Sequence, residues 1–358
     1  MEDQRPSLRD IARRLNVSHA TVSMALRNNP RISEKRRIEV RRVAEEIGYR
    51  PDPMLSSLVA YRQRKQEKPV VSTIAWVNRW PDPRQLRRYS EFDEYWKGAE
   101  KAAEELGYKL EEFVVNEELR GHRLNDILQA RGIQGIMIPP HASNDTWHDL
   151  GIEWDKFSVV RFGFSIADIR AHMIGCDQMR SAELAVSKIS EAGYRSIGFI
   201  TNKPFDTKTG GNFRMGFLRA TEMTPGLRAI APLVLDNPVP VEGGTKEIGA
   251  KVAAWIEENE VDAIFTSEIG LAVTLKKQGI RIPEDIPVAS SSVTERFGID
   301  AGIDQNPFEI GRVAVHVLVG HLNRNDRGEP DHCRRVLVEA NWVPGSSLPV
   351  KAEAASKA

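Results

Sequence analysis

The chain has 358 residues, 41% of them hydrophobic and 28% charged, as in an ordinary globular protein with room for two or three domains. No run approaches the roughly twenty apolar residues of a membrane span, and the first ten residues lack the apolar core of a signal peptide. Its two cysteines lie far apart, which argues against a disulfide framework or a zinc site. We therefore expect a cytoplasmic protein without metal or cofactor.

The charge is balanced overall but not along the chain. Lysines and arginines number 50, as do aspartates and glutamates, yet residues 1–68 hold 16 basic and 9 acidic residues. The remainder is correspondingly acidic. A basic head on an acidic body confines affinity for phosphate groups to one end of the protein.

Two short helices joined by a tight turn are predicted between residues 8 and 26. The first carries an apolar stripe at helical spacing, made of Leu8, Ile11, Ala12 and Leu15. Ser7 and Asp10 have the spacing of a capping box at its start. Asn16 and Val17 make the turn, and Ser18 is placed to cap the second helix.

The second helix uses its apolar side within this small bundle. Val22 and Leu26 face the first helix with Ala25 beside them, which leaves outside a polar or small set of His19, Ala20, Ser23 and Met24. Such a face suits the major groove of DNA. The alternative is an ordinary helical hairpin on a protein surface.

A third helix and a short linker follow. Ser33 caps a helix that runs to about Ile47 and ends at Gly48, with an apolar stripe that closes a three-helix core. Asp52 and Pro53 then open a helix of about two turns, too short to be stable alone in water. This segment forms a helix only when something holds it; otherwise it is a plain flexible linker.

Strands and helices alternate after the charged boundary at residues 62–68. The expected strands cover residues 70–77, 109–115, 133–139, 157–164, 196–201, 230–235, 263–267 and 286–290. The expected helices cover residues 91–106, 124–130, 180–191, 211–221, 245–258 and 269–277. Two such series predict an α/β core of two lobes with parallel sheets, behind an all-α helix-turn-helix headpiece and a hinge helix. Ligands of such folds bind at the carboxyl ends of the strands, so the cleft between lobes is the natural site.

From residue 7 to 61 the chain resembles the DNA-binding headpiece of lactose-repressor-like (LacI/GalR-type) bacterial transcriptional regulators. The pattern is carried by Leu8, Asp10, Ile11, Ala12, Val17, Ser18, Thr21, Val22, Ser23 and Leu26. The resemblance continues less sharply to residue 348, through segments such as Arg131 to Ile136, Gly175 to Asp177 and Gly279 to Ile286. It implies a periplasmic-binding-protein-like effector core that forms a homodimer, because the family's tetramerising leucine heptads are absent.

The resemblance also implies the domain limits. We expect a headpiece at 1–50, a hinge helix and linker at 51–68, a two-lobed core at 69–348 and a flexible tail at 349–358. Lobe one should cover about 69–164 and 293–326, and lobe two about 165–292 and 327–348. The chain then crosses between lobes near Ser165, Ser292 and Arg327, and the helix at 307–322 returns to lobe one.

The implied partner is a roughly palindromic operator in double-stranded DNA. The expected DNA contacts are Ser7, Leu8, Ser18, His19, Ala20, Thr21, Ser23, Met24, Arg27, Arg31, Arg36, Met54, Ser57 and Leu58. Leu58 stands where the family's hinge leucine wedges into the minor groove. Met24 replaces an arginine that reads guanine in many relatives, and Arg27 an asparagine. Base choice should therefore differ here.

Effector contacts are chosen from strand ends, and each aromatic among them could equally be a packing residue. The candidates are Asn78, Trp80, Phe164, Asn202, Phe205, Arg214, Glu268 and Asp304. Phe213 stands where relatives have an arginine, Ser267 and Glu268 replace an Asn-Asp pair, and residues 290–293 replace a Gly-Phe-Asp-Asp stretch. The effector is then a saccharide held by other groups, or a different small ligand.

These features favour a transcriptional regulator, with repression the more usual outcome in the family. An enzyme on a Rossmann-like body is disfavoured, since the chain lacks a Gly-x-Gly-x-x-Gly turn, a Walker loop, a Gly-x-Ser-x-Gly elbow and a metal-spaced His/Glu set. A solute-binding protein is disfavoured by the basic head and the missing signal peptide.

Overall fold

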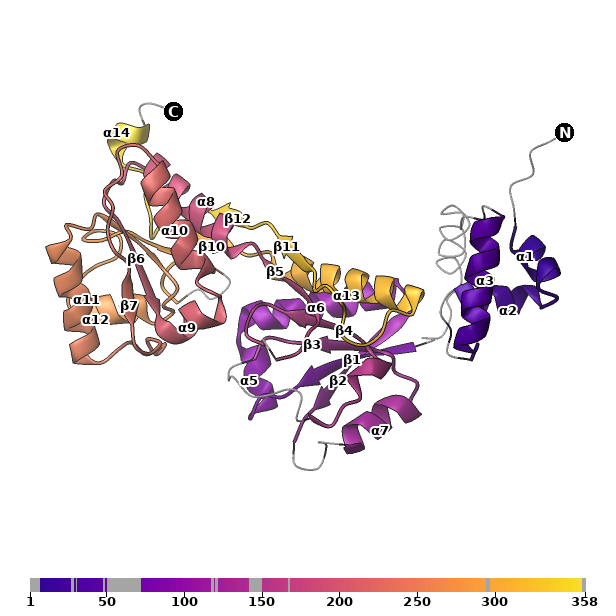
Figure 1. Ribbon diagram of the computed structural model, residues 1–358. Helices are drawn as coiled ribbons and strands as arrows, with labels where there is room; N and C mark the ends of the chain where they lie inside the picture. The colour runs from indigo at the N-terminus through magenta and orange to yellow at the C-terminus, as the bar shows by residue number, and fades with distance from the viewer. Residues whose placement is uncertain are drawn as a thin grey trace.

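The protein consists of a helical headpiece and two α/β lobes (Figure 1). The structure is a computed structural model, and it describes residues 7–26, 29, 31–47, 49, 72–116, 119, 122–141, 150–166, 168–293 and 297–355. The headpiece holds α1 (Leu8–Arg14), α2 (His19–Leu26) and α3 (Glu34–Glu46). Their buried apolar side chains form the predicted three-helix core. No described helix is long and apolar enough to cross a membrane.

Lobe one is built on a parallel sheet of order β11-β5-β4-β3-β1-β2. Its strands are β1 (Ser72–Asn78), β2 (Tyr108–Val114), β3 (Gly135–Ile138), β4 (Ser158–Phe162), β5 (His172–Cys176) and β11 (Arg335–Val338). Its helices are α5 (Pro83–Arg88), α6 (Ser90–Glu105), α7 (His122–Ala130) and α13 (Pro307–Arg324). α6 and α13 cover one face of the sheet, and the core around α7 covers the other.

Lobe two repeats this plan with a sheet of order β12-β10-β9-β8-β6-β7. Its strands are β6 (Ile197–Asn202), β7 (Leu233–Leu235), β8 (Ala263–Thr266), β9 (Val288–Ser290), β10 (Gly302–Asp304) and β12 (Asn341–Val343). Its helices are α8 (Gln178–Glu191), α9 (Lys203–Lys208), α10 (Asn212–Met223), α11 (Lys246–Glu258), α12 (Leu271–Lys277) and α14 (Ala352–Ala355). Only β12 runs antiparallel, against β10.

The predicted α/β alternation is confirmed, with small shifts at the ends of the elements. It arises because central strands such as β3, β6 and β8 are short apolar runs buried on both faces, while the long helices carry an apolar stripe. Four short strands, β5, β10, β11 and β12, were not predicted, and neither were the short helices α5 and α9.

The predicted crossing points at Ser165, Ser292 and Arg327 are wrong. β5 pairs with β4, so the chain stays in lobe one until Asp177. β10 pairs with β9 in lobe two, which moves the second crossing to residues 305–306, just before α13. β11 pairs with β5 and β12 with β10, so the third crossing lies at residues 339–340. The helix expected at 307–322 packs on α6 in lobe one, as predicted.

The expected flexible tail at 349–358 is also contradicted up to residue 355. The backbone N–H of Lys351 donates to the carbonyl of Ala192, and its ammonium pairs with Asp262 at 3.0 Å. The same ammonium lies 4.4 Å from the centre of the Tyr194 ring. These contacts fasten the segment that leads into α14 to lobe two. Residues 356–358 lie outside the described residues.

Candidate functional sites in the headpiece and between the lobes

The turn between α1 and α2 is fixed by the capping groups that the sequence predicts. Ser7 donates its backbone N–H at 2.9 Å and its hydroxyl at 2.6 Å to the Asp10 carboxylate. These hydrogen bonds hold the pKa of Asp10 below its ordinary value. Asn16 has a left-handed backbone with φ of 50°, and Ser18 accepts the Thr21 N–H at 3.0 Å at the start of α2. The angle between the helices is therefore set locally.

α2 presents the predicted outward face. Val22 and Ala25 are fully buried against α1 and α3. Exposed or half-buried positions are held by Ser18, His19, Ala20, Thr21, Ser23 and Met24. This face offers hydroxyls, one imidazole and one thioether, and no guanidinium. It suits contacts with thymine methyls and purine N7 atoms better than the bidentate reading of guanine.

Basic residues flank this face. Arg31 is exposed beyond α2, and its backbone N–H bonds to the side chain of Asn29 at 3.0 Å. Arg36 at the start of α3 pairs with Glu39 at 2.8 Å, with both side chains about 40% exposed. An exposed pair of this kind contributes little stability and can exchange for phosphate. Arg27, Met54, Ser57 and Leu58 lie outside the described residues, so their DNA contacts stay predictions.

In lobe one, the predicted effector residues Asn78 and Trp80 are used by the fold itself. The Asn78 amide donates to Glu112 at 2.9 Å and to the Pro83 carbonyl at 3.1 Å, and its oxygen accepts the Trp80 N–H. The Trp80 indole donates to the Pro140 carbonyl at 2.8 Å. Both side chains are buried. They shape the carboxyl edge of the sheet, and their polar atoms are already engaged.

In lobe two, Asn202 and Glu268 lie together, as their strand ends predict. The Asn202 amide donates to Glu268 at 2.6 Å, and the backbone N–H of Val239 donates to the same carboxyl group at 2.7 Å. Burial raises the pKa of Glu268 despite these hydrogen bonds. The Glu268 carboxyl group thus holds the loop that contains Val239 at the edge of the sheet. A ligand contact was expected at this place.

The other three candidates of lobe two also have partners within that lobe. Phe205 packs on Phe213 with ring centres 5.7 Å apart. The Arg214 guanidinium donates from Nε to Asp206 at 3.0 Å. Asp304 accepts the backbone N–H of Asn306 at 2.9 Å. The structure therefore does not gather the eight predicted effector residues into one site.

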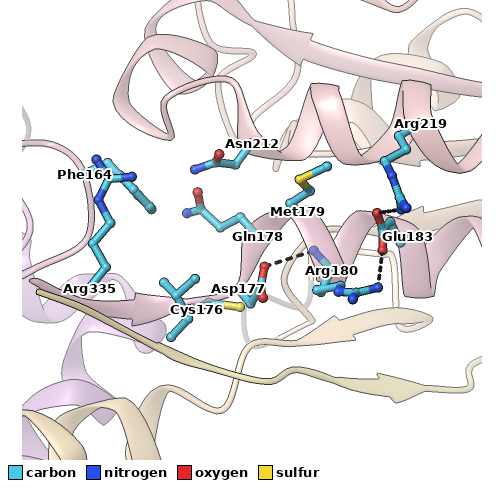
Figure 2. A pocket seen from close by; sticks show the side chains of 11 residues that line it. Phe164, Cys176, Asp177, Gln178, Met179, Arg180, Glu183, Asn212, Arg219 and Arg335 are labelled. Atoms are coloured by element: carbon cyan, nitrogen blue, oxygen red, sulfur yellow. Dashed lines mark hydrogen bonds and ion pairs between the residues drawn. The ribbon is translucent and has the colours of Figure 1, made fainter.

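A cavity of about 390 Å³ lies where the two lobes meet (Figure 2). Lobe one supplies Phe164 after β4, the end of β5, and two side chains of β11. Lobe two supplies the first turns of α8 and α10. The lining is Phe164, Cys176, Asp177, Gln178, Met179, Arg180, Glu183, Asn212, Arg219, Arg335 and Leu337. Of the predicted effector residues, only Phe164 belongs to it.

The sequence reasoning missed Gln178, Asn212 and Arg335. Gln178 directly follows the Gly175-Cys176-Asp177 segment, which was noted as a family signature, so that position carried a signal. Asn212 opens α10 just after a glycine pair. Arg335 carried no signal, because its place depends on the pairing of β11 with β5 from the opposite half of the chain.

A helix-turn-helix headpiece followed by two α/β lobes is the architecture of a DNA-binding regulator. Residues 7–52 match the model described as bacterial regulatory proteins of the lacI family, and residues 186–348 match a periplasmic binding protein-like domain. The chain therefore carries the DNA-binding domain of lacI-family bacterial regulators at residues 7–52, followed by a periplasmic binding protein-like domain.

Relatives and solved structures span nearly the whole chain. The HTH-type transcriptional regulator AscG of Escherichia coli K12 is 24% identical over 78% of this chain and 80% of its own length. The ribose operon repressor of Haemophilus influenzae is 22% identical over 96% and 98%. The CelR–cellobiose complex has a TM-score of 0.57 at 20% identity, covering 96% of this chain and 100% of CelR. The operator-bound lac repressor dimer has a TM-score of 0.50 at 14% identity, covering 97% and 100%.

Proposed function

We propose that this regulator is a repressor that binds a roughly palindromic operator as a homodimer. The observation that carries the proposal is the outward face of α2, where side chains of the right size stand beside exposed arginines on a helix whose apolar side is buried. Two headpieces related by two-fold symmetry would read two half-sites. Such a regulator would act in the cytoplasm.

We further propose that a small-molecule effector, a sugar or sugar derivative, binds in the cavity between the lobes. The cavity is lined by the apolar side chains of Phe164, Met179 and Leu337 and by the amides of Gln178 and Asn212. This combination suits a polyol, which needs an apolar platform and amide partners. Saccharides are bound in relatives of this fold, with cellobiose in CelR and ribose in a regulator from Enterococcus faecium.

Selection of preferred sequences from random duplexes, followed by fluorescence anisotropy over a range of salt concentrations, tests the DNA half of the proposal. Replacing His19 or Met24 with alanine should change the preferred bases but not the slope of log affinity against log salt, because neither side chain neutralises phosphate. Glu100→Gln, an exposed change on α6, is the matched control and should match the wild type in both readouts. An unchanged base preference in both α2 variants would refute the assignment.

The sign of regulation needs a separate measurement. A reporter gene behind the selected operator should be silent when the protein is present and active when it is absent. With the protein present, added effector should restore expression. A reporter that needs the protein for expression would instead make it an activator.

A further inference from the structure

The charges that line the cavity between the lobes do not cancel. Three arginines and two carboxylates line it. Glu183 is held between two of the arginines, pairing with Arg180 at 2.9 Å and with Arg219. Asp177 caps α8 by accepting the backbone N–H of Arg180 at 3.1 Å. Glu183 is therefore paired with arginines of lobe two, whereas Asp177 only caps a helix, and the lining holds one more arginine than carboxylates, as Figure 2 shows.

Arg335 is the arginine that remains. Its guanidinium lies over the Phe164 ring, 5.5 Å from the ring centre, and has no carboxylate partner among the described residues. The ring orients the guanidinium without neutralising it. Leu337, two residues along β11 and 43% exposed, lies on the same side of the strand and lines the same cavity.

A second arginine strengthens the positive field at this place. Arg161 on β4 and Arg335 on β11 both pair with Met173 of β5, so their side chains leave the same face of the sheet. Burial lowers the pKa of Arg161 and the positive charge of Arg335 lowers it further, while Cys333 and Asp168 raise it in part. The Arg161 Nε atom is buried without a hydrogen-bond partner in the described part of the chain. An anion near both groups would relieve this repulsion.

Lobe two adds two amides beside Arg335, and one of them has unused hydrogen-bonding capacity. The Gln178 Oε1 atom is buried and lacks a partner among the described residues. Figure 2 shows the Gln178 and Asn212 amides side by side, on the flank of the cavity where Phe164 and Arg335 lie. α10 starts at Asn212 with no side chain capping its first turn, so the positive end of its dipole adds to the field.

We infer that the effector of this cavity is an anionic polyol, whose carboxylate or phosphate group binds Arg335 while its hydroxyls bind the amides of Gln178 and Asn212. The inference rests on the proposed function, since it names the chemical class of that effector. A neutral sugar would make no use of the charge of Arg335, which is exposed and therefore accessible to a ligand. An acid provides the missing charge and takes advantage of the planar fork of arginine.

Thermal melts and calorimetric titrations of the full chain with matched pairs test this class. The pairs are D-gluconate with D-sorbitol, D-glucuronate with D-glucose, and D-glucose 6-phosphate with D-glucose. At least one acid should raise the melting temperature in a saturable way while its neutral partner does not. The first two pairs report on a carboxylate and the third on a phosphate, so the result separates the two sources of charge.

Variants assign the effect to the residue. Arg335→Gln should weaken the binding of that acid by about tenfold to a hundredfold, as expected for a lost charged hydrogen bond. Arg335→Lys should restore part of the affinity. Arg334→Gln is the matched control, because Arg334 is the residue next to Arg335 but does not line the cavity. The hydrogen bond from its backbone N–H to His172 is kept in this variant. It should bind the acid as the wild type does.

Two results would overturn the inference. One is equal binding of acid and neutral partner with no effect of Arg335→Gln, and the other is no shift by any acid up to about 10 mM. Operator binding, measured on the same samples, reports on the proposed function separately. Specific DNA binding with a response to neutral sugars alone would sustain that function and reject the anionic class.

Discussion

Replacing Gly98 with alanine is the most direct test of how lobe one is held together. Gly98 on α6 faces α13, and a Cβ atom added to it would lie 1.9 Å from the Phe308 carbonyl oxygen and 2.8 Å from the carbonyl carbon. The reciprocal contact is equally close, because a Cβ on Gly311 would lie 2.1 Å from the Tyr95 carbonyl oxygen. The helices cross at two glycines, with backbone against backbone.

The magnitude follows from what can move. Real Cβ atoms keep at least 3.0 Å from such atoms, so the helices must separate by about 1 Å. A backbone carbonyl cannot rotate away as a side chain can, so we expect the upper end of overpacking costs, about 3 kcal/mol. Alanine regains about 1 kcal/mol as the better helix former. The net loss of about 2 kcal/mol should lower the melting temperature by about 4–8 °C.

Gly320→Ala is the matched control, because Gly320 lies in the interior of the same α13. A Cβ atom there would meet only the Arg324 guanidinium, at 3.6 Å. This substitution should therefore raise the melting temperature by about 2–4 °C. Circular dichroism melts of both variants give the answer. If Gly98→Ala melts at or above the wild type, the α6–α13 packing described here is wrong.

Three further outcomes are expected. Val22→Ala should cost the headpiece core about 2 kcal/mol, abolishing operator binding in anisotropy while the lobes melt as in the wild type. Burial and the neighbouring His321 lower the pKa of His172 to about 4. In the unfolded chain His172 takes up its proton at a higher pH, near 6.5, than in the folded protein. The free energy of unfolding should therefore fall as the pH drops from about 6.5 to about 4, and His172→Asn should flatten that dependence in melts at several pH values. Leu58→Ala should weaken specific operator binding but leave nonspecific, salt-dependent binding nearly intact; an equal loss of both would exclude a wedge role.

The elements found from sequence are those specified by local chemistry. The stripe at Ile11 and Ala12, the caps at Ser7, Ser18 and Ser33, and the long amphipathic helices depend on residues within one or two turns of each other. Such signals survive in a single chain because tertiary structure reinforces them. The glycines that follow the helices α6 and α8, Gly107 and Gly193, likewise have the positive φ that a helix end favours.

The lobe boundaries could not be found in this way. β5 and β11 are only 5 and 4 residues long, too short for a strand pattern to stand out in the sequence. Their membership in the first sheet comes from pairing between residues 173 and 335, far apart in sequence. Nothing local distinguishes a strand that ends one lobe from one that begins the next, so the crossings were placed by analogy and missed.

The effector candidates show a related limit. Strand-end reasoning correctly placed Asn78 and Asn202 at the carboxyl edges of the two sheets, but it could not tell a free amide from a satisfied one. Asn78 is bonded to Glu112, and Asn202 to Glu268. The groups with unused capacity, Arg335 and the Gln178 carbonyl, appear only once the side chains are placed.

The position of the cavity has a consequence for regulation. Its walls come from both lobes, so an effector that bridges Arg335 of lobe one and Gln178 of lobe two favours one relative placement of the lobes over others. If operator DNA favours a different placement, the two ligands compete through that equilibrium, and the coupling must be reciprocal. Operator DNA should then weaken effector binding by the same factor by which effector weakens operator binding. Unequal factors, measured under one salt condition, would mean that the effector acts at a place other than this cavity or that the two ligands share more than one equilibrium.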